Sequence, residues 1–127
     1  DKNEDWWVNI IEESYLDDHD CILVPSYKDT HFEHKIVSSF GVSLIRHTNI
    51  SLLEYRTPSS MLDWVPNLFV DVSNEYQQKK ELLKCFRSQL GKRYFQDPQI
   101  DGFHCNFQPM KKGLKYVEQF RMVEAYR

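Results

Sequence analysis

Short apolar runs alternate with longer stretches of helical spacing along this chain, which predicts strands and helices in turn. Residues 21–25, Cys-Ile-Leu-Val-Pro, form an apolar run that ends at a proline, as a short buried strand does. Thr30 stands three residues before Glu33, the spacing of a capping box, and this predicts a helix from Thr30 to about His47. A second strand is predicted at 50–56. Because a strand–helix–strand crossover joins parallel strands, these two strands should be parallel.

The predicted helix that begins at Thr30 carries an apolar stripe that we expect to face the sheet. Its members are Ile36, Val37, Phe40, Leu44 and Ile45. Gly41 lies in the middle of this helix, where glycine costs about 1 kcal/mol relative to alanine. We therefore expect Gly41 to allow close packing of the helix on the sheet.

The rest of the chain predicts further elements of both kinds. In chain order they are a helix from Trp6 to Leu16 capped by Asp5, an acidic turn at 17–20, a turn at 57–60, an apolar loop at 61–66, a strand at 68–72, a helix from Tyr76 to Gln89 capped by Ser73, a helix from 99 to about 107, and a strand at 115–124. This alternation predicts an α/β fold, a sheet flanked by helices, in one domain that spans residues 1–127.

The composition narrows the classes of function. The net charge is −3 and no basic block is present, which argues against binding nucleic acid through its phosphates. No apolar run approaches the roughly 20 residues of a membrane span. Cys21, Cys85 and Cys105 lack C-x-x-C spacing, so we expect reduced thiols, with Cys21 and Cys85 in apolar settings. Reduced thiols indicate a cytoplasmic location.

The candidate chemistry lies at the ends of the two predicted parallel strands. His31 and His34 are three residues apart, so both imidazoles can lie on one helix face at the carboxyl end of a strand, where open α/β sheets bind ligands. Imidazole is a common metal ligand and acid–base group, although such pairs are also ordinary surface residues. Tyr55 and Arg56 end the second strand on the same rim. Together with Glu54 they are candidates for substrate contacts, and a surface salt bridge is the alternative. Trp64 is either a wall of a sugar site or core packing.

Four segments together resemble the LmbE/PIG-L deacetylase family. Residues 29–34, Asp-Thr-His-Phe-Glu-His, resemble its second signature, H-P-D-H preceded by Asp-Thr. Residues 66–73, Pro-Asn-Leu-Phe-Val-Asp-Val-Ser, resemble its P-N-x-F-V-D-I-S strand. The next helix carries a lysine pair at 79–80 and ends in Ser-Gln, and residues 116–121 resemble the closing Y-A-E-A-F-R. Phe32 and Glu33 replace the usual proline and aspartate, and the first signature, A-H-P-D-D-E, has no counterpart before Cys21.

The resemblance implies a Rossmann-like sheet with flanking helices, incomplete in this chain, and a zinc-dependent hydrolase that removes acetyl groups from N-acetylglucosamine-type substrates. In that family zinc activates water and polarises the acetyl carbonyl. The resemblance makes His34 a metal ligand. It makes His31 the group that protonates the leaving amine or stabilises the oxyanion. Asp29 then holds one imidazole in its tautomer.

Because the first signature supplies the other ligands and the general base in the family, we expect this chain alone to be inactive. The chain also opens at Asp1 rather than at methionine, and we expect it to be the C-terminal portion of such an enzyme. Such a portion should expose apolar surface and either self-associate or retain the missing N-terminal fragment. The alternative is a degenerate, non-enzymatic domain that binds a sugar or a protein.

Overall fold

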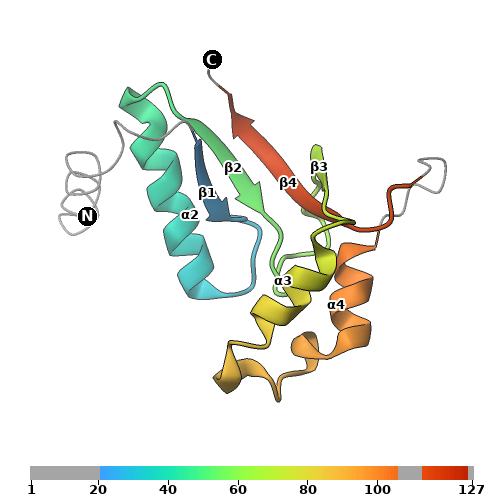
Figure 1. Cartoon of the computed structure of the whole chain (residues 1–127). Helices are drawn as coiled ribbons and strands as arrows, with labels where there is room; N and C mark the ends of the chain where they lie inside the picture. The colour runs from blue at the N-terminus through green and yellow to red at the C-terminus, as the bar shows by residue number, and fades with distance from the viewer. Residues whose placement is uncertain (1–20, 106–112, 126–127) are drawn as a thin grey trace. The chain divides into compact units, whose positions relative to one another are not determined.

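The computed structural model describes residues 21–105 and 113–125, and Figure 1 shows their arrangement. The helices and strands are, in chain order, β1 (Cys21–Pro25), α2 (Phe32–Leu44), η1 (Ile45–His47), β2 (Ser51–Tyr55), β3 (Leu68–Asp71), α3 (Tyr76–Leu83), η2 (Arg87–Gln89), η3 (Arg93–Phe95), α4 (Asp97–His104) and β4 (Val117–Glu124), where η marks a short 3-10 helix. The helix expected at Trp6–Leu16, the turn at 17–20 and the end of the helix expected at 99–107 lie outside the described residues.

The described strands form one mixed sheet in the order β1-β2-β4-β3. β1 and β2 are parallel, as the crossover rule predicts, with Cys21 opposite Ser51 and Pro25 opposite Tyr55. β4 runs antiparallel to β2, with Tyr55 opposite Phe120. The prediction of an α/β fold is therefore confirmed, as a four-stranded mixed sheet with helices.

The chain divides into two compact units. The N-terminal unit comprises residues 1–68 and 120–127, and within it the structure describes β1, α2, η1, β2 and the end of β4. The C-terminal unit comprises residues 69–119, with α3, α4, the short helices η2 and η3, most of β3 and the start of β4. The histidine pair belongs to the first unit.

In the N-terminal unit, α2 packs on one face of β1 and β2, and Gly41 determines how closely (Figure 1). A Cβ atom at Gly41 would lie 2.6 Å from Cγ1 of Val24 and 3.3 Å from Cδ1 of Leu52, so only glycine lets the helix approach this far. The expected close packing is confirmed. Val24 and Leu52 are both buried beneath the helix.

The predicted apolar stripe of α2 is only partly correct. Leu44 and Ile45 are buried, but Ile36 is 36% exposed and Val37 is 45% exposed. The residues of α2 that are buried are Ser38, Gly41 and Leu44. The buried face of α2 is therefore centred on Gly41, and Ile36 and Val37 lie outside it.

The opposite face of the sheet carries a row of apolar side chains. Leu23 lies opposite Leu53, and Leu53 lies opposite Met122. Because side chains alternate between faces, this row points away from the Val24–Leu52 face that α2 covers. Leu23 is 54% exposed and Met122 is 38% exposed. All-parallel sheets have both faces covered, whereas in this mixed sheet Leu23 and Met122 of the row are exposed in the described part of the chain.

In the C-terminal unit, Tyr76 is the buried residue of α3. Its ring stacks on Tyr116 with centroids 3.8 Å apart, and it also contacts the ring of His104. α3 is shorter than predicted, since it ends at Leu83 and the chain leaves the helical conformation at Phe86. Cys85, just beyond this end, is exposed, so the expectation of an apolar setting is wrong.

The predicted cap of α3 is also wrong. Glu75 stands at the cap position without a side-chain cap, and the hydroxyl of Ser73 instead accepts from the backbone N–H of Lys115 and of Tyr116, each at 3.0 Å. Cys21 is half-buried and Cys105 is exposed.

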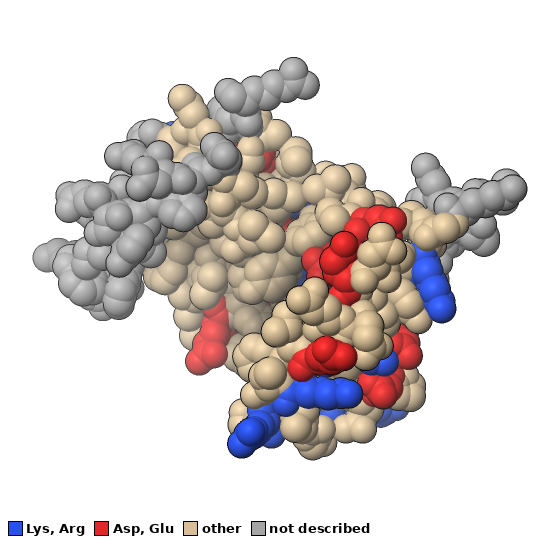
Figure 2. All heavy atoms as spheres, in the orientation of Figure 1, with Lys and Arg blue, Asp and Glu red and all other residues tan. Residues whose placement is uncertain are grey.

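None of the helices that the structure describes is long and apolar enough to cross a bilayer. On the face that Figure 2 shows, acidic and basic side chains are interspersed over α3 and α4 rather than gathered by sign. Lys80, for example, lies 3.2 Å from a carboxylate oxygen of Asp97 and of Asp101.

Candidate functional site

The histidine pair lies where the two parallel strands end. The backbone N–H of Ser26, which follows β1, donates to the carbonyl of Tyr55 at the end of β2. Beyond these ends, Asp29 and Ser60 form an isolated antiparallel bridge, and the N–H of Thr30 donates to the carbonyl of Ser59. The loops that follow β1 and β2 are thus joined along the rim of the sheet.

Asp29 is the centre of this rim. Its side chain is fully buried, and its carboxylate accepts four hydrogen bonds. Oδ1 accepts from the backbone N–H of His31 at 2.8 Å and from Oγ of Ser59 at 2.7 Å. Oδ2 accepts from Oγ1 of Thr57 at 2.5 Å and from Nδ1 of His34 at 3.0 Å. A buried carboxylate with every oxygen satisfied is held in one position.

These contacts also fix the charge of Asp29. Burial opposes ionisation, but the hydrogen bonds from Thr57, the N–H of His31, Ser59 and His34 outweigh it and hold the pKa at about 2. Asp29 is therefore an anion across the physiological pH range. A fixed anion beside an imidazole stabilises the N–H that points toward it.

His34 is oriented by this anion from the first turn of α2. Since the Asp29 carboxylate can only accept, Nδ1 of His34 carries the proton and Nε2 presents its lone pair. The side chain of His34 is 32% exposed, so the ring is accessible. An imidazole held in this way can act as a metal ligand or as a base.

His31 lies at the cap position of α2 rather than inside its first turn. Its exposed ring stacks on that of His34, with centroids 4.6 Å apart and an interplanar angle of 25°. The predicted capping box is wrong, because Thr30 donates its hydroxyl to the carbonyl of Ser59 and makes no cap. The carboxylate of Asp29 instead receives the N–H of His31 at the start of the helix.

The fit of a metal ion can be tested on this geometry. Nearly parallel rings direct their in-plane lone pairs side by side, so His31 and His34 do not converge on one ion. The oxygens of Asp29 are occupied by donors. No group of three His, Cys, Asp or Glu side chains suited to hold a metal occurs within residues 21–105 and 113–125. These residues fit one zinc ligand, His34, and not a whole zinc site.

The expected substrate residues differ in position. Tyr55, at the end of β2, is 36% exposed, and its pKa is raised by burial and by the charge of Asp29. Arg56 is half-buried, and burial lowers the pKa of its guanidinium. Trp64 is 7% exposed and donates its indole N–H to Glu54 at 2.9 Å, which supports the alternative of core packing.

Thr57 and Ser59 are site residues that the sequence analysis missed. Their signal was present, because a Thr-Pro-Ser-Ser turn that follows β2 must lie beside the loop that follows its parallel neighbour β1. Hydroxyls at such a position can donate to a carboxylate. What the sequence does not reveal is that Asp29, rather than a histidine, receives them.

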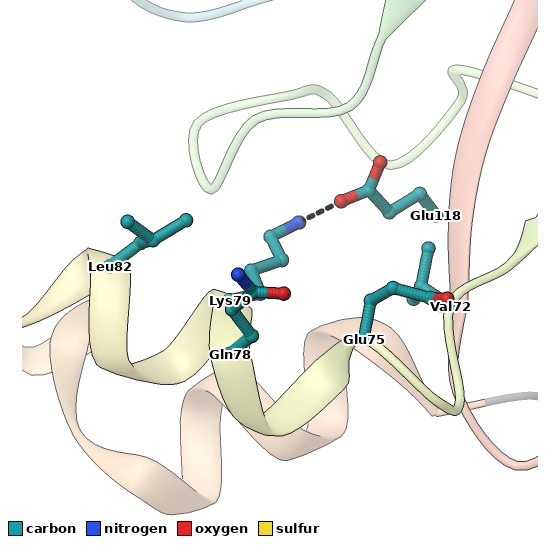
Figure 3. Close-up of a pocket in the computed structure, with 6 residues that line it drawn as sticks. All are labelled: Val72, Glu75, Gln78, Lys79, Leu82 and Glu118. Atoms are coloured by element: carbon teal, nitrogen blue, oxygen red, sulfur yellow. Dashed lines mark hydrogen bonds and ion pairs between the residues drawn. The ribbon is translucent and has the colours of Figure 1, made fainter.

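The C-terminal unit contains a pocket, which is shown in Figure 3. This pocket of about 290 Å³ is lined by Val72, Glu75, Gln78, Lys79, Leu82 and Glu118. Lys79 reaches across it to an ion pair with Glu118, so the lysine charge is already neutralised. Its lining residues include no histidine, cysteine, serine or threonine, and we therefore take the histidine rim of the other unit as the candidate site.

Comparison with protein-family models gives no match for this chain, and comparison with curated proteins gives none either.

Proposed function

We propose that this chain supplies the histidine half of the active site of a metal-dependent amide hydrolase similar to the LmbE/PIG-L deacetylases. The substrate would carry an N-acetylglucosamine-type acetamide. The observation that carries the proposal is the Asp29–His34 pair, whose accessible imidazole lies at the carboxyl ends of two parallel strands. The resemblance of residues 29–34 to the family's second signature supports the same role.

Within this proposal the three rim residues have different tasks. His34 would be a zinc ligand through Nε2, and Asp29 would hold the ring and its tautomer. His31 would protonate the leaving amine or stabilise the oxyanion from its exposed position beside His34. A zinc ion, when bound, would polarise the acetyl carbonyl. Tyr55 and Arg56 are proposed to contact the sugar.

The rest of the site would come from a segment that carries A-H-P-D-D-E, which has no counterpart in these 127 residues. The open row of Leu23, Leu53 and Met122 fits a sheet that forms part of a larger, Rossmann-like fold. The remainder of that fold would cover this row. Self-association through the row is the other way in which it could be covered.

A second candidate function is a non-enzymatic domain that binds a sugar or a protein. It is favoured by one observation, that no group of three His, Cys, Asp or Glu side chains placed to hold a metal occurs in the part of the chain that the structure describes. In that case the Asp29–His34 pair would serve binding or the stability of the loop.

An amide-hydrolysis assay distinguishes these two candidates. The complete reading frame that contains these residues is expressed with Zn²⁺ and incubated with N-acetylglucosamine glycosides, and released amine is measured. We expect hydrolysis that His34→Ala abolishes and that Lys35→Ala, an exposed neighbour, leaves intact. A folded protein that binds the sugar without releasing amine would contradict the hydrolase proposal and support the binding domain.

A further inference from the structure

The loop after β2 reaches the histidine site through two hydroxyl groups. Oγ1 of Thr57 donates to Oδ2 of Asp29 at 2.5 Å, and Oγ of Ser59 donates to Oδ1 at 2.7 Å. Each oxygen of the carboxylate therefore takes one donor from this loop. Its other donors are the N–H of His31 and Nδ1 of His34, from the start of α2.

Thr57 is held within the loop by several hydrogen bonds, since Oγ1 also lies 3.1 Å from Oγ of Ser59 and 3.3 Å from Oγ of Ser60. It is 6% exposed, and Oγ1 accepts from the N–H of Ser59 at 3.2 Å while it donates to Asp29. The N–H of Thr57 in turn donates to Oγ of Ser60 at 2.8 Å. The loop thus carries its own hydrogen bonds and presents the two hydroxyls to Asp29 in a fixed arrangement.

His34 has two possible partners on its Nδ1 side, and the loop decides between them. Oγ of Ser59 lies 3.4 Å from Nδ1, whereas Oδ2 of Asp29 lies 3.0 Å away. Because the Ser59 hydroxyl proton is used on Asp29, Ser59 does not donate to the imidazole. The carboxylate remains the acceptor for Nδ1–H, and Nε2 is left with its lone pair.

We propose that Thr57 and Ser59 are positioning residues, whose hydroxyls hold the Asp29 carboxylate in the one orientation that keeps His34 in its Nδ1–H tautomer. This inference rests on the proposed function for its purpose, since a ligand or base at Nε2 needs that tautomer. Groups that orient a histidine ligand in this way typically change metal affinity by about 10- to 100-fold when they are removed.

The test is a two-bond ¹H–¹⁵N NMR spectrum of the ¹⁵N-labelled 127-residue chain at about pH 8.5, well above the usual histidine pKa of about 6.5. In the parent, His34 should show the Nδ1–H pattern. In the double variant Thr57→Val, Ser59→Ala, both tautomers should appear. The single variant Thr57→Ser, which keeps the hydroxyl, should retain the parent pattern. Thr30→Val is the matched control, because that exposed hydroxyl donates to the carbonyl of Ser59 and does not touch Asp29.

A pure Nδ1–H pattern in the folded double variant would overturn the proposal and leave the two hydroxyls as scaffold. If the double variant does not fold, Ser59→Ala alone decides in the same way, because Ser59 is only half-buried. This readout needs neither zinc nor substrate. A protein that shows the expected tautomer change but binds no zinc would therefore contradict the proposed function and not the positioning role.

Discussion

The carboxylate of Asp29 lies 3.0 Å from Nδ1 of His34, five residues further along the chain, and joins the loop after β1 to the first turn of α2. The same carboxylate receives the N–H of His31, so one buried anion both starts the helix and orients the histidine. A side chain used for stability and for orientation should show both effects when it is changed.

The first prediction concerns acid stability. Hydrogen bonds hold the pKa of Asp29 at about 2, below the value of about 3.9 in an unfolded chain. A lowered pKa adds stability that is present above about pH 4 and is lost as the pH falls toward 2. This group should contribute about 2 kcal/mol to the unfolding free energy.

Asp29→Asn should therefore lower the unfolding free energy at pH 7 and remove that part of its decline between pH 4 and pH 2, as measured by urea titration. Asp63→Asn is the control, since Asp63 pairs with Lys28 at the exposed surface. An equal decline with pH in Asp29→Asn and the parent would show that Asp29 is not a buried, hydrogen-bonded anion in the folded protein.

The second prediction concerns His104, which is 4% exposed in the C-terminal unit. Its Nδ1 donates to the carbonyl of Ile100, and its Nε2 is buried without a partner. Burial lowers the pKa of His104, and the nearby charge of Lys79 lowers it further. The charges of Glu118 and Asp101 raise it and offset part of this effect. A proton on Nε2 would place a buried N–H with no acceptor.

The pKa of His104 is lower in the folded state than in the unfolded chain. Its effect on the unfolding free energy should therefore be absent above about pH 6.5, and the unfolding free energy should decline as the pH falls below that value. His104→Phe should remove this decline between pH 7.5 and pH 5.5, as followed by urea unfolding. A decline of the same size in His104→Phe would assign it to other groups.

The third prediction compares two helical glycines. Gly41→Ala places a methyl group 2.6 Å from Cγ1 of Val24, so strain of about 1–3 kcal/mol should outweigh the gain of about 1 kcal/mol in helix propensity. Gly102→Ala in α4 meets no atom within 4 Å and should gain propensity alone. Thermal unfolding should show a lower Tm for the first variant and a higher Tm for the second. A higher Tm for both would mean that α2 does not pack closely on β1.

The fourth prediction concerns the open row of the sheet. Leu23→Lys replaces a side chain that is 54% exposed and should reduce concentration-dependent association in sedimentation velocity without loss of folding. Val24→Lys, one residue away but buried under α2, should unfold the protein. If Leu23→Lys leaves the association unchanged, the surface through which the protein associates lies elsewhere.

The sequence was sufficient for elements whose pattern is local. The apolar run at 21–25 and the strand at 68–72 were predicted almost to the residue, and Gly41 was predicted to mark a close approach. The strands follow from the local run and alternation of apolar side chains, and the close approach at Gly41 follows from its missing Cβ atom.

The two predicted helix caps that lie within the described residues failed for one physical reason. The hydroxyls of Thr30 and Ser73 have the correct spacing for caps, but distant backbone groups, at Ser59 and at Tyr116, bind them instead. The same long-range contacts build the site, since Thr57 and Ser59 reach Asp29 across 28 and 30 positions. Local propensity is a weak guide wherever such tertiary partners compete.

The fifth prediction tests the central claim, that His34 is a metal ligand and His31 is not. The measurement is the zinc content, by mass spectrometry, of the complete gene product and of its two histidine variants. His34→Ala should lose zinc, because a ligand is removed, whereas His31→Ala should retain zinc and lose about 10²-fold or more in activity. Both should stay folded, since both side chains reach solvent. If His34→Ala binds as much zinc as the parent, His34 is not a ligand and the proposed division of roles between the two histidines is wrong.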